Sequence, residues 1–167
     1  MNLIFEEISD HHDRAAFECE ATPLTEYLKK FAKQNHEKGI TLTFVAIEKG
    51  KPQSILGYYS VNAGQVDFDS LPADARKRIP KYPIPIMRLG RLAVDKQVKG
   101  KGIGRALLMD AFNRAIEASK TLGVFAVIVD AKDENAKAFY KKYGFIEFLD
   151  KPMALFILMS TVKDALN

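Results

Sequence analysis

The chain has 167 residues and a mass of 18.7 kDa, which suits one domain spanning residues 1–167, and no linker rich in Pro, Gly or Ser divides it. With 47% hydrophobic and 28% charged residues, the composition is that of a globular protein and excludes a disordered chain. No apolar run approaches the roughly 18 residues that a membrane-spanning helix needs. The acidic amino terminus lacks an apolar signal segment, and Cys19 is the single cysteine. These features predict a cytoplasmic protein without an intrachain disulfide.

Positive charge is concentrated in the middle of the chain. The net charge is only +4, but residues 76–105 contain ten Lys or Arg residues and one Asp, so this segment alone carries +9. Such a segment predicts an anionic ligand, either a phosphorylated cofactor or a nucleic acid. The alternative is surface charge that only keeps the protein in solution.

The hydrophobic pattern predicts an α+β fold. An N-cap at Thr22 starts an amphipathic helix that Gly39 can end, and Asp133 caps a short helix near the carboxyl end. Pro80, Pro83 and Pro85 predict a loop. In chain order, the expected elements are strand 3–8, helix 22–39, strands 41–48, 55–61 and 86–94, helix 102–122, strand 124–129, helix 133–143, and strands 145–149 and 153–159.

A glycine-rich turn joins the strand at 86–94 to the long helix. Gly100, Gly102 and Gly104 stand at the helix start, where unpaired N–H groups and the helix dipole favour an anion. Glycines also let a diphosphate approach the main chain closely. A dinucleotide fingerprint starting at Gly102 would need glycine in place of Leu107, and no Gly-Lys-Ser/Thr sequence occurs. A glycine-rich turn without a ligand is the alternative.

Two motifs resemble those of the GNAT-superfamily N-acetyltransferases. The turn from Lys99 to Gly104 resembles motif A, which binds the pyrophosphate of acetyl-CoA, and the segment from Asp133 to Phe145 resembles the motif B helix. The family usually has Gln or Arg where Lys99 stands, so the geometry of that side chain departs from the pattern. The resemblance implies the GNAT fold, a central mixed, mostly antiparallel twisted sheet of six to seven strands flanked by about four helices.

Several other segments are similar to the GNAT toxins of bacterial toxin–antitoxin pairs. They include Leu24-x-x-Tyr27-Leu28, Leu89-Gly-Arg-Leu-Ala-Val94 and Asp150-Lys-Pro-Met153, and the likeness covers about residues 14–161. This resemblance implies an enzyme that acetylates the α-amino group of aminoacyl-tRNA and blocks translation. It also implies a ribbon-helix-helix antitoxin as partner. The oligomeric state is left open, and a homodimer is one of the possibilities. The alternatives are acetylation of a protein amine or small polyamine, and a catalytically silent module that binds CoA or nucleic acid.

Acetyl transfer from a thioester needs a neutral amine, a polarised carbonyl and a stabilised thiolate. A free α-amine has a pKa of about 8, so no strong base is needed and positioning can supply most of the acceleration. A bulge at Gly90 would free the backbone beyond it to bind the pantetheine arm. A tyrosine hydroxyl can donate to the departing thiolate, and the resemblance assigns this role to Tyr140. The alternative for Tyr140 is packing in an apolar stripe.

The remaining site residues follow from the motifs and the charge. The residues expected to bind acetyl-CoA are Leu92, Ala93, Val94, Lys99, Gly100, Lys101, Gly102, Ile103, Gly104, Arg105 and Asn135. The residues expected to bind tRNA are Lys29, Arg76, Lys77, Arg78, Arg88 and Arg91.

Other chemistry-bearing residues are expected to be structural. No metal is expected, since the three histidines lack the spacing of a zinc site, and His11-His12-Asp13 predicts a solvated turn. Cys19 is expected to pack in the core, because direct transfer needs no acyl-enzyme. Arg91 is expected either to position the substrate or to pair with Asp95.

Overall fold

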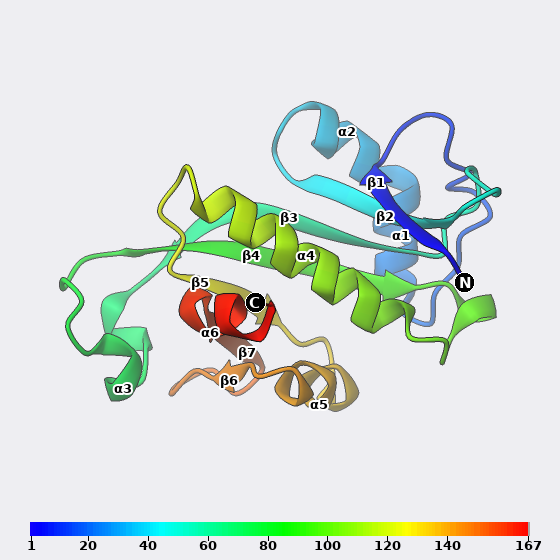
Figure 1. Cartoon of the computed structure of the whole chain (residues 1–167). Helices are drawn as coiled ribbons and strands as arrows, with labels where there is room; N and C mark the ends of the chain where they lie inside the picture. The colour runs from blue at the N-terminus through cyan, green and yellow to red at the C-terminus, as the bar shows by residue number, and fades with distance from the viewer. Residues whose placement is uncertain (167) are drawn as a thin grey trace. The chain divides into compact units, whose positions relative to one another are not determined.

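The computed structural model describes residues 1–166 and forms one mixed sheet of seven strands, in the order β1-β2-β3-β4-β5-β7-β6 (Figure 1). Six α-helices accompany the sheet within these residues. The predicted α+β fold with a mostly antiparallel sheet is therefore confirmed. Over residues 1–166, no helix is both long enough and apolar enough to cross a membrane.

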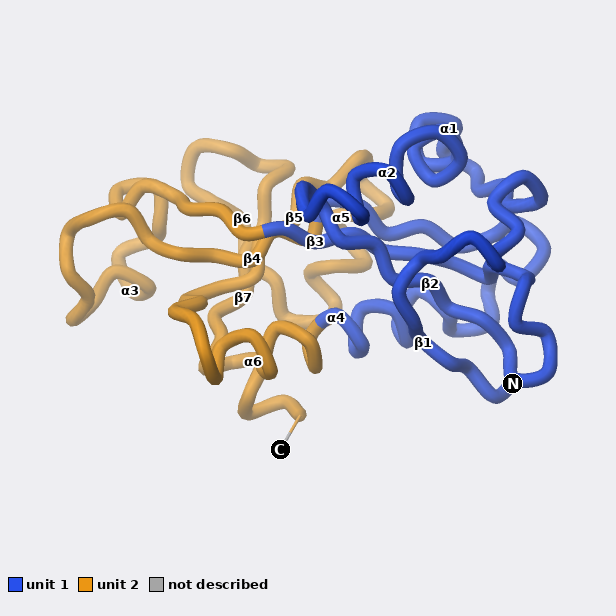
Figure 2. The backbone as a smooth tube through the Cα atoms, turned by 90° about the horizontal axis from the view of Figure 1, so that it is seen from above, with its two compact units in different colours: residues 1–62, 90–111 blue, residues 63–89, 112–167 orange. Residues whose placement is uncertain are grey.

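The chain divides into two compact units, coloured separately in Figure 2. The first consists of Met1–Asn62 and Gly90–Ala111, and the second of Ala63–Leu89 and Phe112–Asn167. Strands β3 (Gly57–Val66) and β4 (Ile84–Val94) and helix α4 (Ile103–Ser119) each contribute residues to both units.

The first unit is built on an antiparallel meander with two helices. β1 pairs with β2 from Leu3↔Glu48 to Glu7↔Phe44, and β2 pairs with β3. Buried side chains of the helices and strands form one core, which includes Leu28, Val45 and Tyr58. The remaining elements of this unit are β1 (Leu3–Glu7), α1 (Thr22–Lys30), α2 (Ala32–Glu37), β2 (Leu42–Glu48) and the 3₁₀ turn η2 (Lys96–Val98).

The helix expected over residues 22–39 is two helices. The backbone leaves helical geometry at Phe31, with φ −124° and ψ −29°, and this residue ends α1 and starts α2. The N-cap is Ala21 rather than Thr22, and its side chain makes no capping hydrogen bond. The break turns the chain so that the Nδ2 of Asn35 on α2 donates to the Tyr27 hydroxyl on α1 at 3.3 Å. The continuous apolar spacing hid this break.

The second unit contains the parallel part of the sheet. β4 pairs with β5 in parallel from Ile86↔Ala126 to Leu89↔Val129, and β5 pairs antiparallel with β7. Apolar residues line both faces of β5, as expected for a strand buried on both sides. The other elements are η1 (Phe68–Ser70), α3 (Ala73–Arg76), β5 (Ala126–Asp130), α5 (Glu134–Lys142), β6 (Ile146–Glu147), β7 (Ala154–Leu158) and α6 (Met159–Leu166).

Several predicted boundaries were wrong. β4 includes Pro85, whose carbonyl accepts the N–H of Phe125 at 2.9 Å, so this proline belongs to a strand rather than to the loop. α4 starts at Ile103 because Gly102 has φ +80°, and it ends before Leu122, whose side chain is 68% exposed. α6 was not predicted, since it is short and lacks a clear cap in the sequence.

Candidate active site

The turn before α4 has the conformation that an anion-binding loop requires. Gly100 has φ +79° and Gly102 has φ +80°, in the left-handed region that side chains other than glycine rarely adopt. A Cβ added at either residue would meet no atom within 4 Å, so the approach to the main chain is open. The first N–H groups of α4, at Ile103, Gly104 and Arg105, have no carbonyl one turn earlier in the helix to bond. The turn can therefore hold a phosphate group.

Asp95 fixes the start of this turn. Its side chain is buried, Oδ1 accepts the N–H of Gln97 at 2.9 Å, and Oδ2 accepts the N–H of Glu18 at 3.1 Å. Its own N–H donates to the carbonyl of Leu56 at 2.8 Å. Both carboxylate oxygens therefore accept backbone N–H groups, and Asp95 forms no ion pair with Arg91. The predicted alternative, an Arg91–Asp95 pair, was wrong.

Gly57 allows the beginning of α4 to lie close to the sheet. An added Cβ would come within 2.8 Å of the Ala93 carbonyl oxygen and 2.9 Å of Leu107 Cδ1. These distances are shorter than any tolerated contact, so only glycine lets β3, β4 and the first turns of α4 meet here. In the sequence, Gly57 is only a glycine inside the strand predicted over residues 55–61, so its packing role was not predicted.

The backbone of Leu92, Ala93 and Val94 lies beyond the part of β4 that pairs with β5. The parallel register ends at Leu89↔Val129, although β4 continues to Val94. β4 continues through Gly90, and its parallel register with β5 ends at Leu89, directly before the residue where the bulge is expected. Main-chain groups left out of this ladder can bond an extended ligand such as a pantetheine arm.

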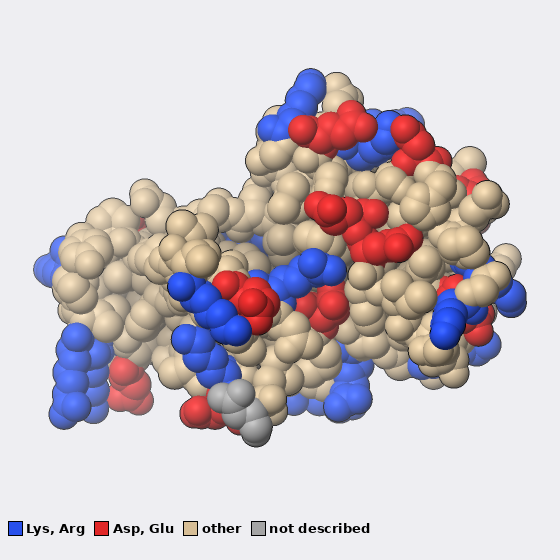
Figure 3. Space-filling view, turned by 45° about the horizontal axis from the view of Figure 1, so that its top comes forward, with Lys and Arg blue, Asp and Glu red and all other residues tan. Residues whose placement is uncertain are grey.

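The basic residues fall into two sets. Five of the ten in the segment 76–105 pair with carboxylates, at distances from 2.6 to 3.8 Å: Arg76–Asp69, Lys77–Asp74, Arg88–Asp130, Lys96–Glu18 and Lys99–Glu20. Within residues 1–166, no carboxylate pairs with the others: Arg78, Lys81, Arg91, Lys101 and Arg105. On the face drawn in Figure 3, blue and red side chains are accordingly interspersed. Exposed pairs of this kind contribute little stability and can exchange partners for a phosphate.

The expected tRNA-binding residues lie in different parts of the fold. Arg76 ends α3, Lys77 follows it, and Arg78 has φ +62°, an uncommon conformation for a side chain of this size. Arg88 lines a cavity of about 230 Å³ in the second unit, together with its partner Asp130. Lys29 lies on α1 in the first unit, where its carbonyl accepts a hydrogen bond from Arg14 at 3.4 Å.

Arg91 stacks on an aromatic side chain. Its guanidinium carbon lies 3.5 Å from the centroid of the Tyr27 ring, and the Tyr27 ring is stacked in turn on Tyr58, with 6.5 Å between centroids. Burial raises the pKa of the Tyr58 hydroxyl, and the positive charge of Arg91 acts in the opposite direction. The Tyr58 hydroxyl donates to the Leu24 carbonyl at 2.6 Å, which ties this stack to α1.

Tyr140 lies on α5 in the second unit. Asp133 caps that helix, its Oδ1 accepting the N–H of Ala136 at 2.8 Å as predicted, and Asn135 is exposed in the first turn. The Tyr140 ring packs edge-on against Phe139 and Phe145, each at 5.3 Å. The Tyr140 ring therefore packs in the core, and this packing does not involve the hydroxyl that the catalytic role requires.

The hydroxyl of Tyr140 is suited to donating a hydrogen bond. Burial raises its pKa well above the ordinary tyrosine value, so the group is protonated at neutral pH. Over residues 1–166 no hydrogen-bond partner occupies this hydroxyl, which leaves its proton available to a ligand.

Cys19 is structural, as expected. Its thiol is buried and lies 3.2 Å from both the Ala21 carbonyl and the Thr25 hydroxyl. Local hydrogen bonds therefore account for this side chain without a nucleophilic role.

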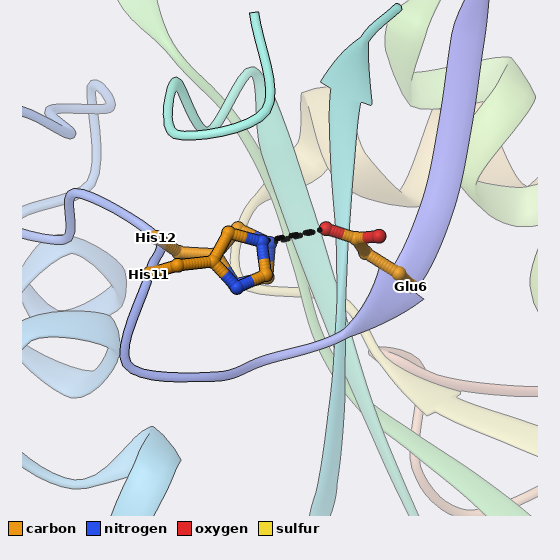
Figure 4. A group of neighbouring side chains, drawn as sticks. All are labelled: Glu6, His11 and His12. Atoms are coloured by element: carbon orange, nitrogen blue, oxygen red, sulfur yellow. Dashed lines mark hydrogen bonds and ion pairs between the residues drawn. The ribbon is translucent and has the colours of Figure 1, made fainter.

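Glu6, His11 and His12 converge on one another, although the sequence predicted a solvated turn at the two histidines (Figure 4). Nε2 of the buried His12 lies 2.7 Å from Glu6, and Nε2 of the exposed His11 lies 3.2 Å from the same oxygen. Nδ1 of His12 accepts the N–H of Ser9 at 3.0 Å, so the proton of the neutral ring is on Nε2. A metal would need Nε2 unprotonated and usually a donating Nδ1, so this cluster suits a hydrogen-bonded structural role rather than a metal site.

We expect His12→Ala to lower the free energy of unfolding by about 1–3 kcal/mol, because it leaves the Ser9 N–H without its acceptor and opens a cavity. His11→Ala, which alters an exposed ring on the same carboxylate, is the matched control and should change stability little. Chemical denaturation measures both variants. Equal losses, or a rise in the Tm of the unaltered protein on adding zinc, would contradict the structural role.

Comparison with known proteins tests the resemblance seen in the sequence. Residues 7–154 match the model of the acetyltransferase (GNAT) domain. The chain belongs to the GNAT acetyltransferase family. The acetyltransferase is 35% identical over 158 residues to a tRNA-acetylating toxin of Mycobacterium tuberculosis (strain ATCC 25618 / H37Rv), covering 95% of this chain and 91% of the relative.

Two solved structures of the toxin AtaT superpose on nearly all of the acetyltransferase. AtaT complexed with acetyl-methionyl-tRNAfMet has a TM-score of 0.92 and 28% identity, covering 99% of this chain and 100% of AtaT. A tyrosine-to-phenylalanine mutant of AtaT, bound to the C-terminus of the antitoxin AtaR and acetyl-CoA, has a TM-score of 0.85 and 26% identity, covering 100% and 99%. The chain is thus an N-acetyltransferase, as the motifs predicted, and its structural neighbour AtaT binds acetyl-CoA.

Proposed function

We propose that this acetyltransferase transfers the acetyl group of acetyl-CoA directly to the α-amino group of an aminoacyl-tRNA and so blocks translation. The observation that carries the proposal is the 35% identity to a tRNA-acetylating toxin along 95% of the chain. The basic residues of the +9 segment and the open glycine turn within it offer groups that can bind the phosphates of both substrates. A substrate of this kind places the enzyme in the cytoplasm.

In the proposed mechanism, the first turn of α4 and the glycine turn hold the pyrophosphate of the donor. Lys101 and Arg105 have no carboxylate partner within residues 1–166, so they can pair with phosphate without losing an existing ion pair. Lys99 must first exchange its 2.6 Å pair with Glu20. The main chain of residues 92–94 fixes the pantetheine arm and the thioester carbonyl.

Acetyl-CoA supplies the acetyl group as a thioester. The chain positions the neutral α-amine against the thioester carbon: a C–N bond forms, the C–S bond breaks, and the amine loses a proton while the thiolate gains one. Tyr140 gives its hydroxyl proton to the departing sulfur, and the proton that the amine releases returns Tyr140 to its neutral form. The raised pKa of Tyr140 keeps the hydroxyl protonated before this step. The α-amine needs no strong base, because its pKa of about 8 leaves a neutral fraction at pH 7.

The decisive experiment combines the purified enzyme, radiolabelled acetyl-CoA and total tRNA charged with amino acids. Label on charged tRNA, released by mild alkali as an N-acetyl amino acid, is the expected result, and uncharged tRNA should take up none. Label that appears only on a polyamine or a protein would favour the alternative acetyltransferase. No turnover with any acceptor would favour a silent binding module.

The basic group on and after α3 offers a test of tRNA docking. We expect joint replacement of Arg76, Lys77 and Arg78 by Ala to weaken tRNA binding. The fall of log K with log salt should become less steep by about two to three, because each phosphate contact contributes about 0.7–0.9. Acetyl-CoA affinity should not change. The matched control removes three other surface charges, at Lys49, Lys51 and Lys163. Equal salt slopes for the two triple variants would show that the group is ordinary surface charge.

A co-encoded antitoxin is the proposed partner, and its DNA-binding part is of the ribbon-helix-helix type. The support is that AtaT has been solved with the C-terminus of its antitoxin AtaR. The unpaired cations favour an acidic or amphipathic segment that folds on binding. We also propose that the enzyme forms a homodimer, and analytical ultracentrifugation measures its mass in solution. We expect co-expression with the adjacent gene product to yield a stable complex and to relieve growth arrest, and failure of both would contradict the partnership.

A further inference from the structure

Arg91 is held differently from the five basic residues of the +9 segment that pair with carboxylates. Five of the ten pair with carboxylates, whereas the described partner of Arg91 is the face of the Tyr27 ring, 3.5 Å from the guanidinium carbon. A guanidinium stacked on a ring keeps its edge N–H donors free, since the ring contacts only the flat face. Arg91 is thus oriented but not neutralised.

The aromatic surface beneath Arg91 is buried and held by hydrogen bonds. Tyr27 is 7% exposed, its hydroxyl accepts a hydrogen bond from Asn35 at 3.3 Å, and its ring is stacked on the fully buried Tyr58. Tyr58 is fixed in turn by the 2.6 Å hydrogen bond to the Leu24 carbonyl. These contacts fix the orientation of both rings. The Tyr27 ring in turn orients the Arg91 guanidinium that lies on it.

Arg91 stands directly before the Leu92–Val94 backbone on β4, where the thioester arm is proposed to bind. Its side chain lies on the same face of β4 as Ala93, which belongs to the core cluster that contains Tyr27 and Tyr58. A planar fork with free donors matches the two oxygens of a phosphodiester. When the acceptor end of an aminoacyl-tRNA brings its α-amine to β4, the last phosphodiester of the tRNA comes close to the same strand.

Resting on the proposed function, we infer that Tyr27 is a positioning residue: its ring holds the Arg91 guanidinium so that Arg91 binds a phosphodiester at the acceptor end of the tRNA. Tyr27 acts only through Arg91 and contacts neither substrate. The ring face is what the role requires, and the Tyr27 hydroxyl is not.

The test compares Tyr27→Phe, Tyr27→Leu and Arg91→Lys with the unaltered enzyme. The acceptors are the charged tRNA that it acetylates and the methyl ester of the same amino acid, which carries no phosphate. Phe31→Leu is the control, since it removes a neighbouring aromatic ring that lies 6.3 Å from Tyr27 and takes no part in the stack with Arg91.

For charged tRNA we expect Tyr27→Leu to raise KM by about 3- to 30-fold with kcat nearly unchanged, the range expected for a partly desolvated cation–π contact. Arg91→Lys should raise KM similarly, and Tyr27→Phe should behave as the unaltered enzyme. The methyl ester should show no change in KM for any variant. An equal KM increase with the methyl ester, or an unchanged KM for charged tRNA in a folded Tyr27→Leu variant, would overturn the inference. Failure of the unaltered enzyme to acetylate any charged tRNA would instead overturn the proposed function.

Discussion

Tyr140→Phe should reduce kcat for acetyl transfer by roughly 100-fold or more, the usual scale for the loss of a general acid. This corresponds to about 2.7 kcal/mol of transition-state stabilisation. The substitution removes one hydroxyl and keeps the ring that packs against Phe139 and Phe145. Because no hydrogen bond within residues 1–166 uses that hydroxyl, stability and acetyl-CoA affinity should hardly change. Steady-state kinetics, thermal denaturation and calorimetry measure the three quantities.

Tyr143→Phe is the matched control, because it removes a hydroxyl from the residue that ends the same helix and whose ring also packs against Phe139, at 5.1 Å. It should leave kcat unchanged. An expressed Tyr140→Phe variant should no longer arrest growth, whereas the Tyr143→Phe variant should still arrest it. Near-normal turnover by Tyr140→Phe would show that Tyr140 only packs and that the thiolate takes its proton from elsewhere.

Gly102→Asp should abolish measurable acetyl-CoA binding. The residue has φ +80°, so any side chain there is strained, and a carboxylate at the open side of the turn repels the pyrophosphate. Gly102→Ala carries the strain without the charge and should weaken binding much less. Isothermal titration calorimetry with acetyl-CoA distinguishes the two effects.

Gly50→Asp controls for backbone strain. Gly50 lies in the turn between β2 and β3 with φ +92°, and an added Cβ there also meets nothing within 4 Å. It should destabilise the fold about as much as Gly102→Asp and leave acetyl-CoA affinity unchanged. Unchanged affinity in Gly102→Asp, or equal losses in both variants, would refute the pyrophosphate site.

The sequence alone determined the parts of this protein that depend on local pattern. Alternating and continuous apolar runs predicted all seven strands, and Asp133 was identified as a helix cap because capping needs only nearby residues. The glycine turn was also local: Gly100 and Gly102 have the positive φ that makes glycine necessary. Family membership followed from the same motifs, since their order and spacing are properties of the sequence.

Features that depend on distant neighbours came only from the tertiary structure. The Arg91–Tyr27 stack joins residues 64 positions apart, and Gly57 matters because Ala93 and Leu107 fold against it. The same holds for the charges, because carboxylates such as Asp130 and Glu20 neutralise half of the basic segment through contacts that a sequence count cannot see. Periodicity also missed the break at Phe31, because two short helices can carry one continuous apolar spacing while the hydrogen bonds between them decide the turn. Local propensity and motif spacing are encoded by neighbouring residues, whereas burial, pairing and ring stacking depend on which distant side chains the fold brings together.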